Sequence, residues 1–584
     1  MLLLSLARLI SARQELNTAR LRMEASRNEV LARHDDEARA ALSEAGRKIT
    51  GARHDLALPP IRVLSAIPLV GSPWRAAGDA AAAGKHGVAA GRVMIDAASS
   101  FPNAGGSGLA GHDVTAIHAA ITKTNVALVE ANAELAAADR DLAGARHAVL
   151  PVIASPARAM SGAIGDARTQ LQSASRVVSL LNTLLDPAGD HRFLLLAQDT
   201  LEARPTGGFI GSFGVLHVAQ GKLTLERYED SRTLPAPDPP LDPPPDLAPS
   251  LPRYWGLSNT DWWPDFPTSA SVAKEMFKRQ GGGDVDGVIS VTEHLLGDLV
   301  GVLGPIQLPD YDKPVVEDGF DQRVVYEVEL KKPPDVPQKK FLILLAKDVL
   351  DRLFSAPPDK VPDLAKAFGG AASSGDLQIW MADPKLQNTV LQTGVSGALP
   401  RANQDFVMLT DANVEASKAN AGLVRTMSYR VDHRGDHYYG HFEAIYENQA
   451  PQSPTNPFYL GYLRLYVPAG ARLLNAHDNQ FAQGTASDDG QFDVFAQYVQ
   501  VDPLTQKKVV FDYQLPDRVA PDGHYQLVWA RQAGAPRDTQ IAVIRGRTYH
   551  GVATKRSFVA KRSFNPSGIR GFLHSRAMFR RIGL

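Results

Sequence analysis

Apolar residues recur every seven positions at the start of the chain, which is the spacing of a long helix with a narrow apolar seam. Leu9, Leu16, Met23 and Val30 follow this period, and small or aliphatic residues continue it at alternating intervals of four and three as far as residue 56. Pro59-Pro60 then interrupts the pattern. We therefore expect one long helix that ends at these prolines.

A second heptad follows after a glycine-rich loop at 102–111. Its apolar positions run from Ile121 to Val149, and a further helical pattern covers 157–185. The second helix is long enough to pair antiparallel with the first. Residues 1–187 are therefore predicted to form an α-helical stalk or bundle with a scaffolding role.

At Pro187 the periodicity changes from helical to extended. The apolar run at 192–199 is typical of a strand covered on both faces, and 209–218 alternates strictly before a hairpin turn at "AQGK". Later segments alternate between strand and helix: a proline-rich extended loop, a helix starting at Thr268 or Ser269, a strand at 285–291, and helices at 292–304, 339–355 and 360–382. This order predicts an α/β domain with a mixed sheet over residues 188–400.

From Phe406 onward, short alternating segments are separated by Gly, Pro, Asp and Asn turns. They predict an antiparallel β-sandwich over 401–545, followed by a basic tail at 546–584. The fold class expected for the whole chain is therefore multidomain α+β: an N-terminal long-helix bundle, a central α/β domain and a C-terminal sandwich.

Composition narrows the class of protein further. The 584 residues include 62 basic and 63 acidic side chains, so the overall charge does not favour nucleic acid as a partner. There are no cysteines, which excludes disulfides, thiolate metal sites and cysteine nucleophiles. Phosphate-loop, HExxH and GxSxG motifs do not occur either.

Both chain ends carry features that bear on membranes. The opening "MLLLSLARLI" is about half the ~20 apolar residues that cross a bilayer, so it is either the end of a longer span or an ordinary helix start. Residues 545–584 mix ten Lys or Arg with apolar residues and contain no acidic residue. That tail suits an anionic membrane surface, although a disordered basic end would have the same composition.

Several separated segments resemble the bacterial envelope proteins of domain-of-unknown-function family 4012. They are "HRFLLLAQDTLEARPTGGFIGSFGVLHVAQGKL", "NTDWWPDFPTSA", "VDGVISVTEHLLGDLVGVLGPIQLP" and "LTDANVEASKAN", with a weaker "VWARQAG" near the C-terminus. The resemblance covers about 188–420. Because family members typically carry an N-terminal membrane helix, it implies a cell-envelope, extracytoplasmic location and an anchor that is truncated at this start.

The layout is also distantly similar to the LytR-CpsA-Psr phosphotransferases, which move glycopolymers from a polyprenyl-pyrophosphate carrier onto peptidoglycan. Arg204 matches the first arginine of that family's Arg-x-Asp-Thr motif, but Pro205 and Thr206 stand where the acidic element is expected. Asp230 and Arg232 fall near its second motif. This similarity implies a polyprenyl-pyrophosphate-linked glycan or cell-wall polymer as partner, with Mg²⁺ as cofactor.

A pyrophosphate site needs cations for the phosphoryl oxygens, carboxylates for Mg²⁺ and close backbone approach. The predicted catalytic residues are therefore Arg204, Arg232 and Asp230. The predicted substrate-binding residues are Gly207, Gly208, Trp262 and Trp263. The predicted metal ligands are Asp261 and Asp265.

Each candidate also has a structural alternative. Arg204 could form a salt bridge with Glu202 or cap a strand end, the aspartates could belong to turns and helix caps, and the tryptophans could pin the proline loop onto the core. Two functions therefore stay open. One is binding or transfer of a lipid-linked glycan, and the other is a non-catalytic cell-surface structural or binding module.

Overall fold

A computed structural model describes most of the chain. The described residues exclude 1, 32–33, 68–70, 100–111, 147–150, 251–253, 332–339, 358–359, 401–402, 478–482, 487–490, 536–537, 552–556 and 564–584. The predicted glycine-rich loop and the last part of the basic tail therefore lie outside the described residues.

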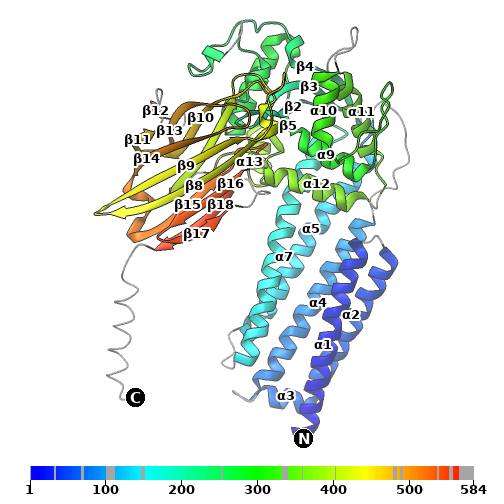
Figure 1. The fold of residues 1–584 in the computed structure, drawn as a ribbon. Coiled ribbons are helices and arrows are strands. Elements are labelled where there is room, and N and C mark those ends of the chain that lie inside the picture. The colour runs from blue at the N-terminus through cyan, green and yellow to red at the C-terminus, as the bar shows by residue number, and fades with distance from the viewer. Residues whose placement is uncertain are drawn as a thin grey trace.

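The N-terminal region is helical, as predicted, and forms an elongated bundle that leads away from the sheets (Figure 1). Its helices are α1 (Leu2–Leu31), α2 (Asp35–Leu56), α3 (Pro59–Ser65), α4 (Ser72–Ala98), α5 (Thr115–Asp141), α6 (Ala143–Arg146) and α7 (Pro151–Leu184). In the part of the chain that the structure describes, none of the helices combines the length and hydropathy needed to cross a bilayer.

The prediction of one long helix before Pro59 is wrong, because α1 and α2 are two helices packed against each other. Asp35, Asp36 and Glu37 occupy the first turn of α2, where acidic side chains favour a helix start. Ala19 of α1 and Ala45 of α2 are both buried in one apolar cluster. The seam that suggested continuity instead packs the two helices together.

The central sheet has six strands in the order β1-β4-β3-β2-β5-β6. They are β1 (His112–Asp113), β2 (Asp190–Arg204), β3 (Gly207–Ala219), β4 (Lys222–Asp230), β5 (Gly287–Thr292) and β6 (Leu377–Met381). The β2–β5 pair is parallel and the other pairs are antiparallel, so the predicted mixed sheet is confirmed.

Helices cover both faces of this sheet. Helix α8 (Phe266–Phe277) packs on one face, while α9 (Glu293–Leu303), α11 (Lys340–Phe354) and α12 (Val361–Ser374) belong to the other. Short helices α10 (Phe320–Val325), η5 (Tyr326–Leu330) and α13 (Pro384–Leu391) also belong to this region.

Two local predictions in this domain are wrong. The segment 360–382 is not helical throughout, because α12 is followed by the edge strand β6. Helix α8 is capped by the side chain of Asp265, which accepts the backbone N–H of Thr268, rather than by Thr268 or Ser269. A carboxylate is an equally good cap, and the prolines around it obscured the choice.

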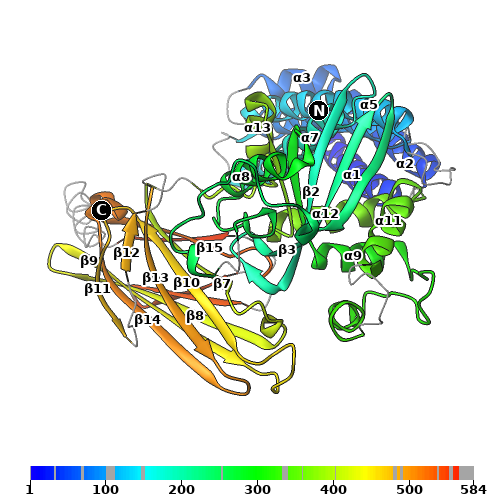
Figure 2. The same cartoon turned by 90° about the horizontal axis from the view of Figure 1, so that it is seen from above.

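The C-terminal region consists of two six-stranded sheets (Figure 2). One has the order β12-β13-β10-β7-β15-β18 and the other β11-β14-β9-β8-β16-β17. Their strands are β7 (Asp405–Asn413), β8 (Leu423–Arg434), β9 (His437–Asn448), β10 (Tyr459–Pro468), β11 (Arg472–His477), β12 (Gln483–Ala486), β13 (Phe492–Val501), β14 (Gln506–Leu515), β15 (His524–Ala530), β16 (Thr539–Ile544), β17 (Arg547–His550) and β18 (Ser557–Ser563).

The sequence predicted purely antiparallel sheets, but both C-terminal sheets are mixed. The β7–β15 and β8–β16 pairs are parallel. In each pair the partners lie far apart in sequence, so alternation within each segment did not reveal their direction. Strands β17 and β18 fall inside the segment predicted as a basic tail, and β18 pairs with β15.

Candidate functional site

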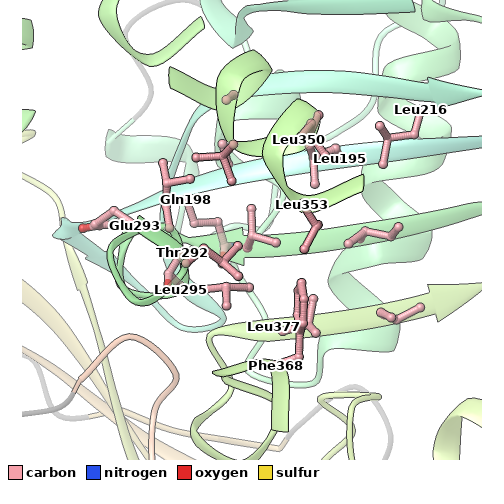
Figure 3. A pocket seen from close by; sticks show the side chains of 18 of the residues that line it. Leu195, Gln198, Leu216, Thr292, Glu293, Leu295, Leu350, Leu353, Phe368 and Leu377 are labelled. Atoms are coloured by element: carbon pink, nitrogen blue, oxygen red, sulfur yellow. The ribbon is translucent and has the colours of Figure 1, made fainter. Parts of the chain in front are cut away.

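A large apolar cavity lies between the central sheet and the helices on one of its faces. Its volume is about 860 Å³, near the upper end of the range for ligand pockets. Its walls come mainly from Leu, Ile, Val and Phe side chains of β2–β6, α5, α7, α9, α11 and α12. Figure 3 shows several of these side chains pointing into the open space.

The alternation of β2 explains why one sheet face forms a wall. Leu195 and Ala197 line the cavity, whereas Leu194 and Leu196 belong to the buried cluster under α8. The space stays open because small residues occupy several wall positions, including Gly211 and Ala197 on the sheet and Ala346, Ala365, Gly369 and Ala372 on the helices.

The cavity follows the direction of β2. Phe193 near the start of the strand and Asp199 before its irregular end both line it, a separation of about 20 Å for an extended chain. Leu181 and Leu184 of α7 contribute to the wall, and Leu184 clusters with Phe193. The end nearest the helical bundle is therefore apolar.

The opposite end of the cavity is charged and is called the mouth below. Asp199 follows the apolar run of β2, and Glu293 follows β5 directly. Because Gln198 pairs with Thr292 in the parallel β2–β5 ladder, both acids leave the same edge of the sheet. In Figure 3, Glu293 and Gln198 lie at one end of the cavity and Leu216 at the other.

Glu293 is held by a turn of the backbone at Thr200. One carboxylate oxygen accepts the backbone N–H of Thr200 at 2.7 Å and its hydroxyl at 2.6 Å. Burial, and then the nearby Asp199 carboxylate, raises the pKa of Glu293 to about 7. This side chain can therefore exchange a proton near neutral pH.

His294 lies behind Glu293. Its Nδ1 is 3.1 Å from Asp376 Oδ1, and its Nε2 is 3.4 Å from the hydroxyl of Thr200. Burial alone would lower the pKa of His294, but the Asp376 hydrogen bond and the Glu293 carboxylate raise it to about 9. At neutral pH it is thus an imidazolium that balances part of the negative charge.

Lys418 reaches the mouth from the connection between β7 and β8, in the C-terminal region. Its Nζ lies 2.7 Å from Asp199, 3.3 Å from Glu202 and 3.8 Å from Glu329. Burial would lower the pKa of Lys418, but the Asp199 and Glu202 carboxylates outweigh it and raise the pKa. The ammonium therefore stays charged while buried.

Arg204 does not reach the cavity. The residue is 6% exposed, and it donates to Glu202 at 3.1 Å and to the backbone carbonyl of Asn413 in β7. The carbonyl of Arg204 in turn accepts the side-chain N–H of Gln532 at 2.9 Å. The salt bridge to Glu202, anticipated as the structural alternative, is present, and Arg204 joins the sheet to the C-terminal region.

The two predicted glycines allow close approach of a neighbouring strand. A Cβ on Gly208 would lie 2.0 Å from the carbonyl oxygen of Asp199, and one on Gly207 would lie 2.3 Å from the side chain of Gln198. Gly207 also has φ of 147°. Both glycines therefore let the start of β3 lie close against β2 where the register of the hairpin shifts.

The predicted acidic residues have different partners in the structure. Asp230 pairs with Arg232 at 2.6 Å at the end of β4, and Asp265 caps α8. Asp261 is 2% exposed, lies 3.5 Å from the Gln198 amide, and burial raises its pKa to about 7 despite the charge of Arg204.

The tryptophans pack as aromatic anchors. Trp262 is 1% exposed and stacks on Tyr462 of β10 with ring centroids 5.8 Å apart, while Arg464 lies 4.3 Å over its ring. Trp263 packs against Trp255 at 6.1 Å. Trp262 therefore contacts the C-terminal region.

None of the nine predicted site residues is among those that line the cavity. Sequence reasoning missed Asp199, Glu293, Glu329 and Lys418. A signal for two of them was available, because side chains that follow adjacent parallel strands gather at the same sheet edge. Lys418 and Glu329 come from other segments, and no local pattern marked them.

The predicted Mg²⁺ ligands, Asp261 and Asp265, do not gather with a third acidic or histidine side chain in the described ranges. Asp265 already accepts hydrogen bonds from Thr268 and Leu399, and within the described ranges no group of three or more His, Cys, Asp or Glu side chains could hold a metal ion. Mg²⁺ binding therefore stays a prediction without a ligand set.

Part of the chain, including two acidic residues of the mouth, matches a known protein family. Residues 188–326 match the family model DUF4012, described as a protein of unknown function. The resemblance to domain-of-unknown-function family 4012 is thereby confirmed for this region. The DUF4012 match includes β2, β5, Asp199 and Glu293 but ends before Glu329 and Lys418.

Other comparisons add little to the DUF4012 match. No curated protein matches the chain. A solved structure from Legionella pneumophila, titled "putative nutrient binding protein", is 11% identical, with 28% of this chain and 68% of that chain covered. Its TM-score is 0.18, which carries no argument about fold or function.

Proposed function

We propose that this is a membrane-associated cell-envelope protein whose α/β domain binds the apolar chain of a polyprenyl-type lipid, the class of carrier on which envelope glycans are built. The observation that carries the proposal is the 860 Å³ apolar cavity with its charged mouth. Burying apolar surface in such a space is the main source of affinity for a hydrocarbon chain.

The shape of the cavity favours a chain over a compact ligand. It follows β2 for about 20 Å between Phe193 and Asp199, and its charged side chains gather at the mouth. A lipid has the same division, with a long apolar part and one polar end. The polyprenyl-pyrophosphate-linked glycan expected from the LytR-CpsA-Psr resemblance contains a chain of this kind.

Binding is better supported than transfer. Arg204 and Asp265 are engaged in structural contacts, and Arg232 is paired with Asp230. The two C-terminal sheets share one apolar core, which supports their interpretation as a β-sandwich. In this proposal the helical bundle and the sandwich serve as spacer and support, with an extracytoplasmic, envelope location.

A cavity-filling substitution tests the proposal. Ala372 of α12 lines the cavity, whereas the adjacent Ser373 is exposed, so Ala372→Trp and Ser373→Trp form a matched pair. We expect geranylgeraniol to bind the natural protein and Ser373→Trp equally, and to bind Ala372→Trp at least about tenfold more weakly because the ring occupies the chain's space.

Equilibrium dialysis with radiolabelled geranylgeraniol would measure these affinities, and circular dichroism would show that both variants fold. Absence of binding to the natural protein would refute the proposed function. Equal binding by Ala372→Trp and Ser373→Trp would show that the chain binds outside the cavity.

A further inference from the structure

The charged side chains at the mouth determine which head group the proposed lipid ligand could have there. Among the described residues that line the cavity, the charged side chains are the carboxylates Asp199, Glu293 and Glu329 and the ammonium of Lys418. Carboxylates therefore outnumber the cation in the lining itself.

The cations near the mouth already have carboxylate partners. Lys418 is surrounded by Asp199, Glu202 and Glu329. Arg204 pairs with Glu202, Arg232 pairs with Asp230, and His294 pairs with Asp376. A negatively charged head would have to compete with these carboxylates for each cation.

The same carboxylates are good acceptors for a different kind of head. Oxygens of ionised carboxylates accept hydrogen bonds from hydroxyl and ammonium groups, and those involving a charge are stronger than neutral ones. A hydroxyl or amine at the end of a buried chain would find such acceptors at Asp199 and Glu329. An added phosphate would instead face like charges in a partly buried site.

We infer that the cavity selects chain lipids by the charge of their heads, favouring an uncharged hydroxyl or a cationic amine over an anionic phosphate. The inference rests on the proposed lipid-binding function and narrows it. The preferred ligand is a polyprenol-type alcohol or a long-chain amine, rather than the pyrophosphate ester that the LytR-CpsA-Psr resemblance suggested.

Three probes with the same chain test this selectivity. Geranylgeraniol, geranylgeranylamine and geranylgeranyl diphosphate would each compete with a fluorescent isoprenoid for binding to the full-length protein. The competition would be measured first with EDTA and then with Mg²⁺. We expect the alcohol and the amine to bind at least about tenfold more tightly than the diphosphate in both conditions.

Glu329→Gln is the decisive variant, because Glu329 lies at 3.8 Å from Lys418 and the closer Asp199 contact remains. Removing this charge should reduce the ratio of the alcohol's affinity to the diphosphate's affinity by several fold. Asp190→Asn is the matched control, because Asp190 is an exposed acid at the other end of β2. This substitution should leave the affinity ratio of the two probes unchanged.

The outcomes separate this inference from the function on which it rests. If the three probes bind equally, head selectivity is refuted and chain binding stands. If the diphosphate binds most tightly, with or without Mg²⁺, the inference is overturned in favour of a pyrophosphate-linked carrier. If none of the probes binds, the proposed function fails, and the inference fails with it.

Discussion

Arg204 illustrates how the environment decides the role of a residue type. Arginine beside glycines suits phosphate binding, and the sequence offered that hypothesis together with a salt bridge to Glu202. In the structure the guanidinium is buried with Glu202 and the carbonyl of Asn413. Its partners lie in β2 and in β7, and the β7 partner is more than two hundred positions away in the chain. Local spacing could not reveal that second partner.

We predict that Arg204→Met is strongly destabilising. It leaves the buried Glu202 with one fewer cation and the Asn413 carbonyl without this donor, so the free energy of unfolding should fall by about 3–5 kcal/mol. Urea unfolding would measure the change. Arg232→Met is the control, because its side chain is 54% exposed, and it should cost less than about 1 kcal/mol. Similar losses in both variants would contradict the role assigned to Arg204.

Glu293 gives the folded protein a specific pH dependence. Its pKa is about 7 when folded, compared with the ordinary value of 4.5, so the folded state binds more protons than the unfolded state between these values. The free energy of unfolding should therefore decrease as pH rises through this window, by up to about 3 kcal/mol from this group. Below the ordinary pKa its contribution no longer changes.

Comparing the natural protein with Glu293→Gln isolates this effect. Asp261 and Asp405 are also buried with pKa values of about 7 and act with the same sign, so both proteins should lose stability with rising pH. The slope between about pH 5 and pH 7 should be shallower in Glu293→Gln. Identical slopes in denaturant titrations would show that Glu293 is ionised throughout. His294, with its pKa near 9, affects mainly higher pH.

At the scale of elements, the periodicity of apolar residues predicted whether a segment is a helix or a strand better than it predicted where that element begins and ends. The alternation at 209–218 and the "AQGK" turn correspond to β3 and its hairpin with β4, where Gln220 and Gly221 both have positive φ. By contrast, the heptad pattern did not show where α1 reverses into α2. A seam of alanines has the same spacing in one continuous helix and in two helices packed face to face.

The α1–α2 hairpin predicts an overpacking effect. Ala45 of α2 is fully buried in a cluster with Ala19, so a larger side chain has no space. Ala45→Leu should lower the free energy of unfolding by about 1–3 kcal/mol. Ala40→Leu is the control on the exposed face of the same helix. Equal losses in the two variants, measured by thermal unfolding, would contradict the close packing of Ala45.

At the scale of the molecule, the site depends on contacts between distant segments. The lining of the mouth combines β2, β5 and η5 with Lys418, which precedes β8. The sequence predicted the order of helical, α/β and β regions and the mixed central sheet. It did not predict the cavity, because a cavity depends on how helices seat over a sheet and on which small residues face each other across it.

Trp262 and Arg464 should be energetically coupled across the two regions. The guanidinium lies 4.3 Å over the indole ring and donates to the Trp262 carbonyl. In a double-mutant cycle with Trp262→Leu and Arg464→Met, we expect a coupling of about 1–2 kcal/mol in the free energy of unfolding. Additive losses would mean that the two regions are held together by other contacts.

The last turns of α7 have a consequence for any chain that enters the cavity. Leu181 and Leu184 belong both to the bundle and to the cavity wall, and β2 begins a few residues later. In the proposed function the bundle would act as a ruler for chain length, because the position at which α7 packs against the sheet would limit how many isoprene units fit. A shift of α7 by one turn would change that length by about 5 Å, so the proposal couples the position of the bundle to the length of the ligand.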